Sequence, residues 1–96
     1  MIQSFGDVPT EDVHHGRDTK QARRLPKQLW GVIRRKLDMV HAAHSLHDLR
    51  VPPNNQLEEL KYDRPGHHSI RVNDQYRIVF RFVDGNAHDV TCEDVH

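Results

Sequence analysis

The sequence predicts an α+β fold in which two N-terminal helices pack on one face of a mainly antiparallel sheet of four to five strands. Apolar residues recur at helical spacing in the first half of the chain and alternate with polar residues in the second half. A Pro-Pro-Asn-Asn break at residues 52–55 separates the two patterns. Because the 96 residues show no repeat and suffice for one core of modest size, we expect a single domain over residues 1–96.

Two helices are expected after a short opening strand at residues 2–5. The first begins at Pro9, has acidic residues in its first turn and ends near Gly16. The second begins at Pro26, which a first helical turn tolerates, and ends at about His44. Its apolar stripe consists of Leu29, Trp30, Ile33, Leu37 and Val40. The basic residues expected to lie mostly off this stripe are Arg34, Arg35 and Lys36.

The second half of the chain is expected to form an antiparallel meander. Its strands are predicted at residues 57–61, 68–72, 76–82 and 87–93, and the turn signals between them include Asp84-Gly85. The residues expected to face the helices are Ile70, Val72, Ile78 and Phe80. Alternation with a period of two then places Arg71, Arg77 and Arg81 on the opposite, open face of the sheet.

Three arginines on one open sheet face suggest an anionic ligand, because like charges opposite one another destabilise a sheet. The alternative is local neutralisation by Asp63, Asp74 and Asp89. The charge distribution favours the anion, since the net charge is zero but residues 61–81 hold five basic residues against two acidic ones. Residues 17–36 hold eight against one, but this stretch taken alone is better interpreted as a solvated helix face.

Composition limits the class of protein. The single cysteine, Cys92, cannot form an internal disulfide, which predicts a reducing, cytoplasmic compartment. No apolar run reaches the length of a membrane span, and the N-terminus lacks the pattern of a signal peptide. Nine histidines raise the question of a metal site, but His41, His44 and His47 drift round a helix axis, and the chain has no second cysteine and no His-Glu-x-x-His motif. We therefore expect neither a metal site nor another cofactor.

Several side chains of the second half suit the cleavage of RNA. When a 2′-hydroxyl attacks the neighbouring phosphate, a base takes its proton, an acid protonates the leaving 5′-oxygen, and cations stabilise the charge on the phosphorane. Arginine binds phosphate through a planar fork, and histidine transfers protons near neutral pH. The chain offers Lys61, Arg71, Arg77 and His96 for these roles, with Asp94 to orient a base or to act as one.

Two stretches of the sequence resemble the HigB-type toxins of the RelE superfamily. They are Leu49-Arg50-Val51-Pro52-Pro53-Asn54-Asn55-Gln56-Leu57-Glu58-Glu59-Leu60-Lys61 and Ser69-Ile70-Arg71-Val72-Asn73-Asp74-Gln75-Tyr76-Arg77-Ile78-Val79-Phe80. The resemblance implies a RelE-like domain and a ribosome-dependent endonuclease that cleaves mRNA in the A site and inhibits translation. It also implies a HigA-type helix-turn-helix antitoxin as partner, through which alone the protein would reach operator DNA.

The residues that match the family's working residues are Lys61, Arg71, Arg77, Asp94 and His96. Two positions depart from the family pattern. Val95 replaces the tyrosine between the final aspartate and histidine, and Tyr62 replaces the glycine that follows the lysine, so that Tyr62 is a candidate for the missing aromatic ring. The residues expected to contact RNA are Tyr62, Arg64, Arg81, Arg23, Arg24 and Lys27.

The alternative function is a non-catalytic or attenuated toxin-fold protein that binds RNA or the ribosome. Binding requires only the arginines, whereas cleavage also requires proton transfer by His96 or Lys61. The replacement of the family tyrosine by Val95 favours this alternative somewhat.

Overall fold

The structure is a computed structural model that describes residues 1–60 and 64–95. Its strands are β1 (Glu58–Leu60), β2 (His67–Arg71), β3 (Tyr76–Val83) and β4 (Asn86–Asp94). They form one antiparallel sheet in the order β1-β2-β3-β4, which confirms the predicted meander. The end of the first predicted strand, at Lys61, lies outside the described residues.

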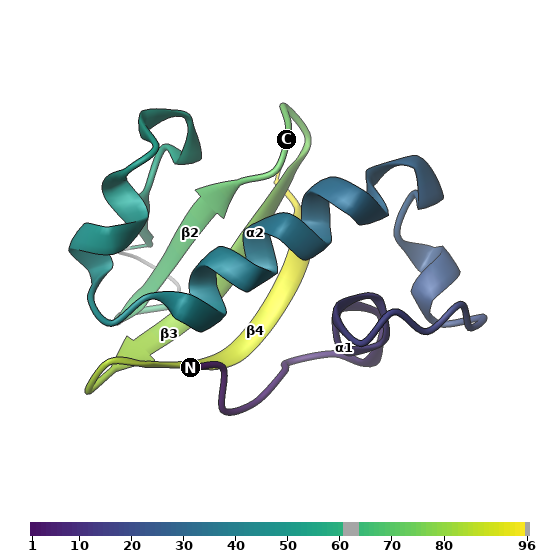
Figure 1. The fold of residues 1–96 in the computed structure, drawn as a ribbon, viewed down its shortest axis with the longest axis horizontal. Helices are drawn as coiled ribbons and strands as arrows, with labels where there is room; N and C mark the ends of the chain where they lie inside the picture. Colours follow the sequence, from purple (N-terminus) through teal and green to yellow (C-terminus); the bar gives the residue numbers. More distant parts are fainter. Residues whose placement is uncertain (61–63, 96) are drawn as a thin grey trace.

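Two α-helices precede the sheet, as predicted, and are α1 (Val8–His14) and α2 (Trp30–Ala42). Figure 1 shows α2 lying across the sheet, with α1 on the β4 side and the turns that follow α2 on the β2 side. Pro26 precedes a single 3₁₀ turn (Lys27–Leu29), so the α-helix begins four residues later than predicted. None of the described helices has the length and apolarity needed to span a lipid bilayer.

The hydrophobic core lies between α2 and the sheet. The fully buried residues of this cluster include Ile33, Leu37 and Val40 from α2 and Ile70, Ile78 and Phe80 from β2 and β3. Burying each of these side chains stabilises the fold by roughly 1.5–3 kcal/mol relative to exposure. Both the helical stripe and the strand alternation predicted from the sequence are therefore confirmed for these residues.

Lys36 is a correction to the predicted helix stripe. We expected it on the solvent side of α2, but its residue is only 6% exposed. Its Nζ donates to Asn55 Oδ1 over 2.6 Å, and Asn55 belongs to a 3₁₀ turn (Pro53–Asn55) that packs close to β2. The long alkyl stem of lysine can lie along the core surface when its amine finds an acceptor, and here the acceptor comes from a distant part of the sequence.

The N-terminal segment covers the outer edge of β4. The opening strand predicted at residues 2–5 forms two isolated parallel bridges, Ile2 to Ala87 and Phe5 to Val90, and the sheet formed by the described residues has four strands. Further along the same edge, the backbone amide of Cys92 donates to the Thr10 hydroxyl over 2.8 Å. The edge is thus protected from pairing with another chain, although no full fifth strand forms.

Candidate RNA-binding and cleavage site

The site begins with two arginines on the open face of the sheet. Arg71 and Arg77 are direct partners in the ladder between β2 and β3. Their neighbours Ile70 and Ile78 are fully buried on the helix side, so alternation places both arginines on the other face. Two like charges directly opposite each other oppose sheet formation, and an anion bound between them would relieve this repulsion.

Arg77 is held by neutral oxygen atoms. Its Nε donates to Ser69 Oγ over 2.8 Å, and its NH2 donates to the carbonyl oxygens of Ser69, at 3.3 Å, and Gln56. Among the described residues, no acceptor is bonded to NH1, which leaves two donors of the fork for a ligand. The bonds also explain why Ser69, although it lies on the open face, is only 1% exposed.

The surroundings of Arg77 are partly desolvated. Burial lowers the pKa of its guanidinium, the Glu58 carboxylate raises it, and the Arg71 charge lowers it again. Arginine stays protonated at any physiological pH, so these effects change the cost of its charge and leave its state unchanged. A phosphate placed next to this group would therefore interact with a cation that water screens less than a surface arginine.

The other two strand arginines have carboxylate partners. Arg71 NH2 lies 2.5 Å from Asp74 Oδ1, and Arg81 Nε lies 3.4 Å from Asp89 Oδ2. Local neutralisation, the alternative considered from the sequence, thus occurs at both arginines, while Asp63 lies outside the described residues. The Asp74 side chain is 99% exposed, so its ion pair is solvent-screened and weak. A phosphate can displace such a partner at small cost.

A second ion pair lies beside Arg77 on the same face. Glu93 of β4 is the ladder partner of Arg77, and its two carboxylate oxygens each accept one bond of 2.6 Å from Arg64. Thr91 Oγ1 donates to the same carboxylate over 2.6 Å. The Arg64 bond is the main reason why the pKa of Glu93 lies below its ordinary value, in spite of partial burial that raises it. Arg71, Arg77 and Glu93 therefore lie side by side on β2, β3 and β4, and Arg64 neutralises the carboxylate of Glu93.

Sequence reasoning did not single out Glu93. Its signal was the alternation of Thr91 and Glu93 in the last strand, which places both on one face. Its alignment with Arg77 could not be predicted from the turn at Asp84-Gly85. Between Val79 and Arg81 the pairing of β3 with β4 shifts its register, so the residues far from the turn are offset from those near it. Asp89, at φ +55°, lies at this irregularity.

Asp94 lies at the end of β4, where strand alternation places it on the opposite face of the sheet from Glu93. Its ladder partner is Tyr76, whereas Glu93 is the residue opposite Arg77. The Asp94 carboxylate accepts a bond of 2.9 Å from the side chain of Gln75 in the turn between β2 and β3. The Val95 amide, just after β4, donates to the Gln75 carbonyl in this turn over 2.8 Å. The backbone alternation therefore does not bring Asp94 directly onto the row of arginines.

Three of the predicted site residues, Lys61, Tyr62 and His96, lie outside the described residues. Their roles stay predictions. Their described neighbours in the sequence are Leu60, the last residue of β1, and Val95, which follows β4 and is exposed.

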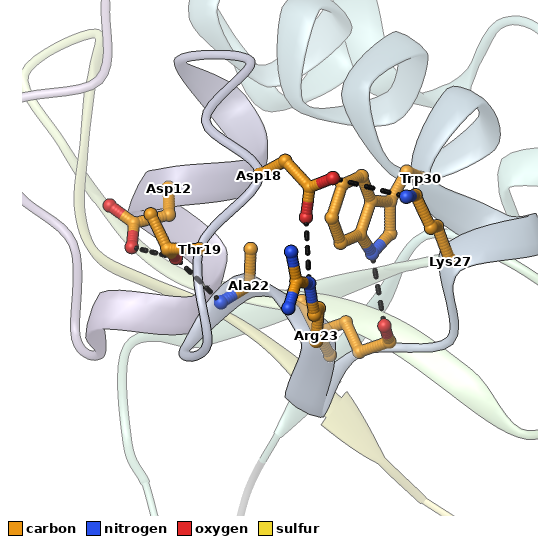
Figure 2. Close-up of polar contacts among 8 residues, drawn as sticks. Asp12, Asp18, Thr19, Ala22, Arg23, Lys27 and Trp30 are labelled. Atoms are coloured by element: carbon orange, nitrogen blue, oxygen red, sulfur yellow. Dashed lines mark hydrogen bonds and ion pairs between the residues drawn. The ribbon is translucent and has the colours of Figure 1, made fainter.

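Two of the basic residues predicted to contact RNA before α2, Arg23 and Lys27, share one carboxylate, whereas Arg24 is exposed beside them in the sequence. Asp18 accepts bonds from Arg23 Nε, at 2.9 Å, and from Lys27 Nζ, at 3.0 Å, as Figure 2 shows. Lys27 also lies 5.5 Å from the centre of the Trp30 ring, and the Trp30 indole donates to the Leu25 carbonyl. This N-terminal basic cluster (Asp18, Arg23, Lys27 and Trp30) is thus partly neutralised within itself.

Comparison with solved structures places the fold among bacterial toxins. The chain is similar over its full length to a chain of the YoeB-YefM complex from Staphylococcus aureus, with a TM-score of 0.61, 16% identity and 98% of that chain covered. It is also similar to the YoeB/ParE toxin from Agrobacterium tumefaciens, with a TM-score of 0.53, 17% identity, and 97% and 98% of the two chains covered. At these identities the likeness defines the fold, which is the RelE-like α+β fold predicted from the sequence.

Sequence comparison defines the family. Residues 11–96 match the model of the HigB-like toxins, described as RelE-like toxins of type II toxin-antitoxin systems. The chain is 44% identical over 87 residues to Toxin HigB-1 of Vibrio cholerae, covering 91% of this chain and 90% of the relative. Over 41 residues it is 44% identical to Endoribonuclease HigB of Proteus vulgaris, covering 43% and 45% of the two chains. The protein belongs to the HigB family of RelE-like toxins, which confirms the resemblance noted in its sequence.

Proposed function

We propose that this protein is an endoribonuclease toxin that cleaves mRNA in the A site of the translating ribosome. Its membership of the HigB family and the name of its Proteus vulgaris relative, Endoribonuclease HigB, support a ribonuclease. The observation that carries the proposal is the opposed pair of Arg71 and Arg77 on the open face, with the NH1 group of Arg77 directed to no acceptor among the described residues.

The proposed reaction is an attack of the 2′-hydroxyl on the adjacent phosphate without a metal ion. The oxygen–phosphorus bond to the 2′-oxygen forms while the bond to the 5′-oxygen breaks, leaving a 2′,3′-cyclic phosphate and a free 5′-hydroxyl. Arg77 and Arg71 would stabilise the negative charge that builds on the non-bridging oxygens. Lys61 and His96 are the candidates for the two proton transfers, and Asp94 is the candidate that orients one of them.

The proposed partners follow from the family. A type II toxin is paired with an antitoxin, and we propose that the antitoxin here is a HigA-type helix-turn-helix protein. The ribosome and its mRNA are the proposed substrate complex, and operator DNA would be reached only through the antitoxin. We also propose that the free protein cuts naked RNA poorly, because the described open face carries no series of aromatic rings on which bases could stack.

The proposal is tested by single-turnover cleavage of mRNA on programmed ribosomes. We expect wild-type protein to release a product cut in the A-site codon, and Arg77→Lys to cut at least about 100-fold more slowly, because lysine keeps the charge but cannot supply the fork. His96→Ala is expected to cut more slowly as well. Arg35→Lys is the matched control, since Arg35 is exposed on α2, and its rate should stay within about threefold of wild type.

The same assay distinguishes the alternative of a binding protein without cleavage. Val95 favours this alternative, since valine in place of the family tyrosine can neither stack on a base nor donate a proton. If wild-type protein binds ribosomes but releases no product, the enzyme proposal fails and the binding proposal stands. If wild type cuts and His96→Ala cuts equally well, only the assignment of His96 fails.

A further inference from the structure

We propose that Asn55 is a positioning residue for Arg77, acting through the backbone carbonyl of Gln56. The inference rests on the proposed function, because it assigns Asn55 to the presentation of the Arg77 guanidinium to phosphate. Asn55 itself is completely buried and touches no substrate. Its side chain holds the turn from which the next residue, Gln56, reaches Arg77.

Asn55 is fixed by the elements that surround it. Its Oδ1 accepts from Lys36 Nζ over 2.6 Å, and its Nδ2 donates to the Leu49 carbonyl over 3.2 Å. The same amide nitrogen lies 3.7 Å from the sulfur of Met39. One side chain therefore ties the 3₁₀ turn Pro53–Asn55 to α2 and to the turn that precedes it.

Lys36, the partner of Asn55, is a buried cation held by a neutral amide oxygen. Lys36 is 6% exposed, and within residues 1–60 and 64–95 no carboxylate lies at ion-pair distance from its amine. A buried ammonium group is costly unless it is hydrogen-bonded, so the acceptor supplied by Asn55 is important to this arrangement. An apolar residue at position 36 would fill the core without this cost, but it would not hold Asn55.

Gln56 connects the turn that Asn55 fixes to the guanidinium of Arg77. Its backbone has φ 46° and ψ 58°, a left-handed conformation that residues other than glycine adopt at a cost. Its amide donates to the Pro53 carbonyl over 3.0 Å, which closes the turn, and its own carbonyl accepts from Arg77 NH2. A buried anchor on one side of Gln56 and a guanidinium on the other maintain this conformation.

The bond from Arg77 to the Gln56 carbonyl helps to set the orientation of the Arg77 guanidinium. The bonds to Ser69 hold one edge of the guanidinium against β2, and the Gln56 carbonyl holds NH2 from the side of β1. Together they fix the plane of the group and leave NH1 without an acceptor among the described residues. If the turn loosens, the guanidinium can rotate, and a donor displaced by about 1 Å from a developing charge can cost about 100-fold in rate.

The test is a double-mutant cycle of Asn55→Ala with Arg77→Ala in the single-turnover cleavage assay. We expect Asn55→Ala to lower the rate at saturating ribosome by about 10-fold or more, while the concentration for half-maximal rate changes less than about threefold. In the Arg77→Ala background the same substitution is expected to lower the rate less than about threefold. Val13→Ala on α1, which removes a buried side chain far along the sequence from this turn, is the stability control and should leave the rate of folded protein unchanged.

A second variant and a measurement on the free protein test the positioning role of Asn55 independently of the double-mutant cycle. Lys36→Met retains the alkyl stem, removes only the amine, and should lower the cleavage rate in the same direction as Asn55→Ala but less. Nuclear magnetic resonance of the free protein should show faster solvent exchange of the Arg77 Nε proton in both variants, with the Arg81 Nε proton, which bonds Asp89, unchanged. This readout does not depend on activity.

Equal slowing by Asn55→Ala in the wild-type and Arg77→Ala backgrounds, or an unchanged exchange rate of the Arg77 Nε proton, would overturn the positioning role. Slowing of the same size by Val13→Ala would overturn it as well, because lost stability would then explain the effect. If wild-type protein does not cut at all, the proposed function fails, and proton exchange alone decides whether Asn55 positions Arg77.

Discussion

Arg77 differs from the other described arginines of the open face in the atoms that hold it. Ser69 and Gln56 supply neutral oxygens, whereas Arg71, Arg81 and Arg64 each bind a carboxylate. A neutral acceptor orients the guanidinium and leaves its full charge to an incoming phosphate. A carboxylate neutralises the guanidinium, so a phosphate must either displace the carboxylate or bind the guanidinium together with it. Restraint by neutral oxygens is therefore the arrangement expected of a group that stabilises charge during a reaction.

Glu93→Gln is predicted to weaken the fold at neutral pH and to have less effect in acid. The charged bonds to Arg64 become neutral ones, and because both side chains are partly solvent-screened we expect the free energy of unfolding to fall by about 0.5–1 kcal/mol. The folded-state pKa of Glu93 is depressed, so the stabilising charge is present above the unfolded pKa of about 4.3 and is lost as the pH falls through the folded value.

Urea unfolding of both proteins at pH 7 and in steps below pH 4 measures this difference. Glu59→Gln, at an exposed position of β1, is the control and should change the free energy of unfolding by less than about 0.5 kcal/mol. A deficit of Glu93→Gln that stays the same at all pH values would contradict the assignment of the stabilisation to the ion pair.

At the scale of elements, periodic patterns predicted the helices and strands well, and contacts between distant residues explain what they missed. The stripe of α2 and the alternation of β2 and β3 are local consequences of burial on one side. The burial of Lys36 depends on Asn55, 19 residues later, and no local pattern records that pairing. Likewise the position of Glu93 opposite Arg77 depends on a register shift within the β3–β4 hairpin. The candidate site was thus predicted as a set of side chains, and its detailed arrangement required the structure.

Thr10→Val is predicted to weaken the attachment of α1 to the sheet. The Thr10 hydroxyl is fully buried and accepts the Cys92 amide at the outer edge of β4, so valine leaves that amide without its partner. An unsatisfied buried donor costs about 1–3 kcal/mol of the free energy of unfolding. Amide hydrogen exchange at Cys92, together with chemical denaturation, measures the effect.

Thr10→Ser is the matched control for this substitution, because it keeps the hydroxyl oxygen and removes only a methyl group. We expect it to protect the Cys92 amide nearly as well as wild type does. Exchange at Cys92 that is equally fast in the serine and valine variants would show that the hydroxyl does not hold this edge.

At the scale of the whole molecule, the histidines of the N-terminal region predict a loss of stability in mild acid. His14 packs against the rings of Phe5, His15 and His41, at centroid distances of 5.3, 5.1 and 6.1 Å. Burial is the main cause that lowers the pKa of His14, followed by His15; Asp38 raises it, and His41 and Arg34 lower it. The folded state therefore binds fewer protons at this residue than the unfolded chain, whose pKa is about 6.5.

Stability is complete above the unfolded pKa and decreases as the pH falls from about 6.5 toward the depressed folded value. His14→Gln should flatten the dependence of the free energy of unfolding on pH between 7.5 and 5.5, as measured by urea denaturation. His88→Gln makes the same change of side chain in β4 and is the matched control for the substitution itself. Identical slopes for His14→Gln and wild type would contradict the prediction.

The distribution of charge over the molecule leads to a prediction about RNA affinity. Eight basic residues between positions 17 and 36 suggest a strongly cationic surface, but Asp18 binds both Arg23 and Lys27 in the folded protein. The bonds from Lys27 and Arg23 lower the pKa of Asp18, so its charge is present at neutral pH. Asp18 thereby reduces the attraction of the N-terminal basic cluster for phosphates.

Asp18→Asn should therefore strengthen binding to ribosomes and to single-stranded RNA, and the gain should disappear as salt is added. If Arg23 and Lys27 each gain one phosphate contact, the slope of the logarithm of the binding constant against the logarithm of salt concentration steepens by about 1.4, at roughly 0.7 for each phosphate on a single strand. Fluorescence anisotropy with a labelled oligonucleotide over a range of salt concentrations measures this slope. Asp84→Asn makes the same change of charge at the exposed β3–β4 turn and should leave the slope near that of wild type. Equal slopes for both variants would show that the N-terminal basic cluster does not contact RNA, and the open face of the sheet would then account for binding.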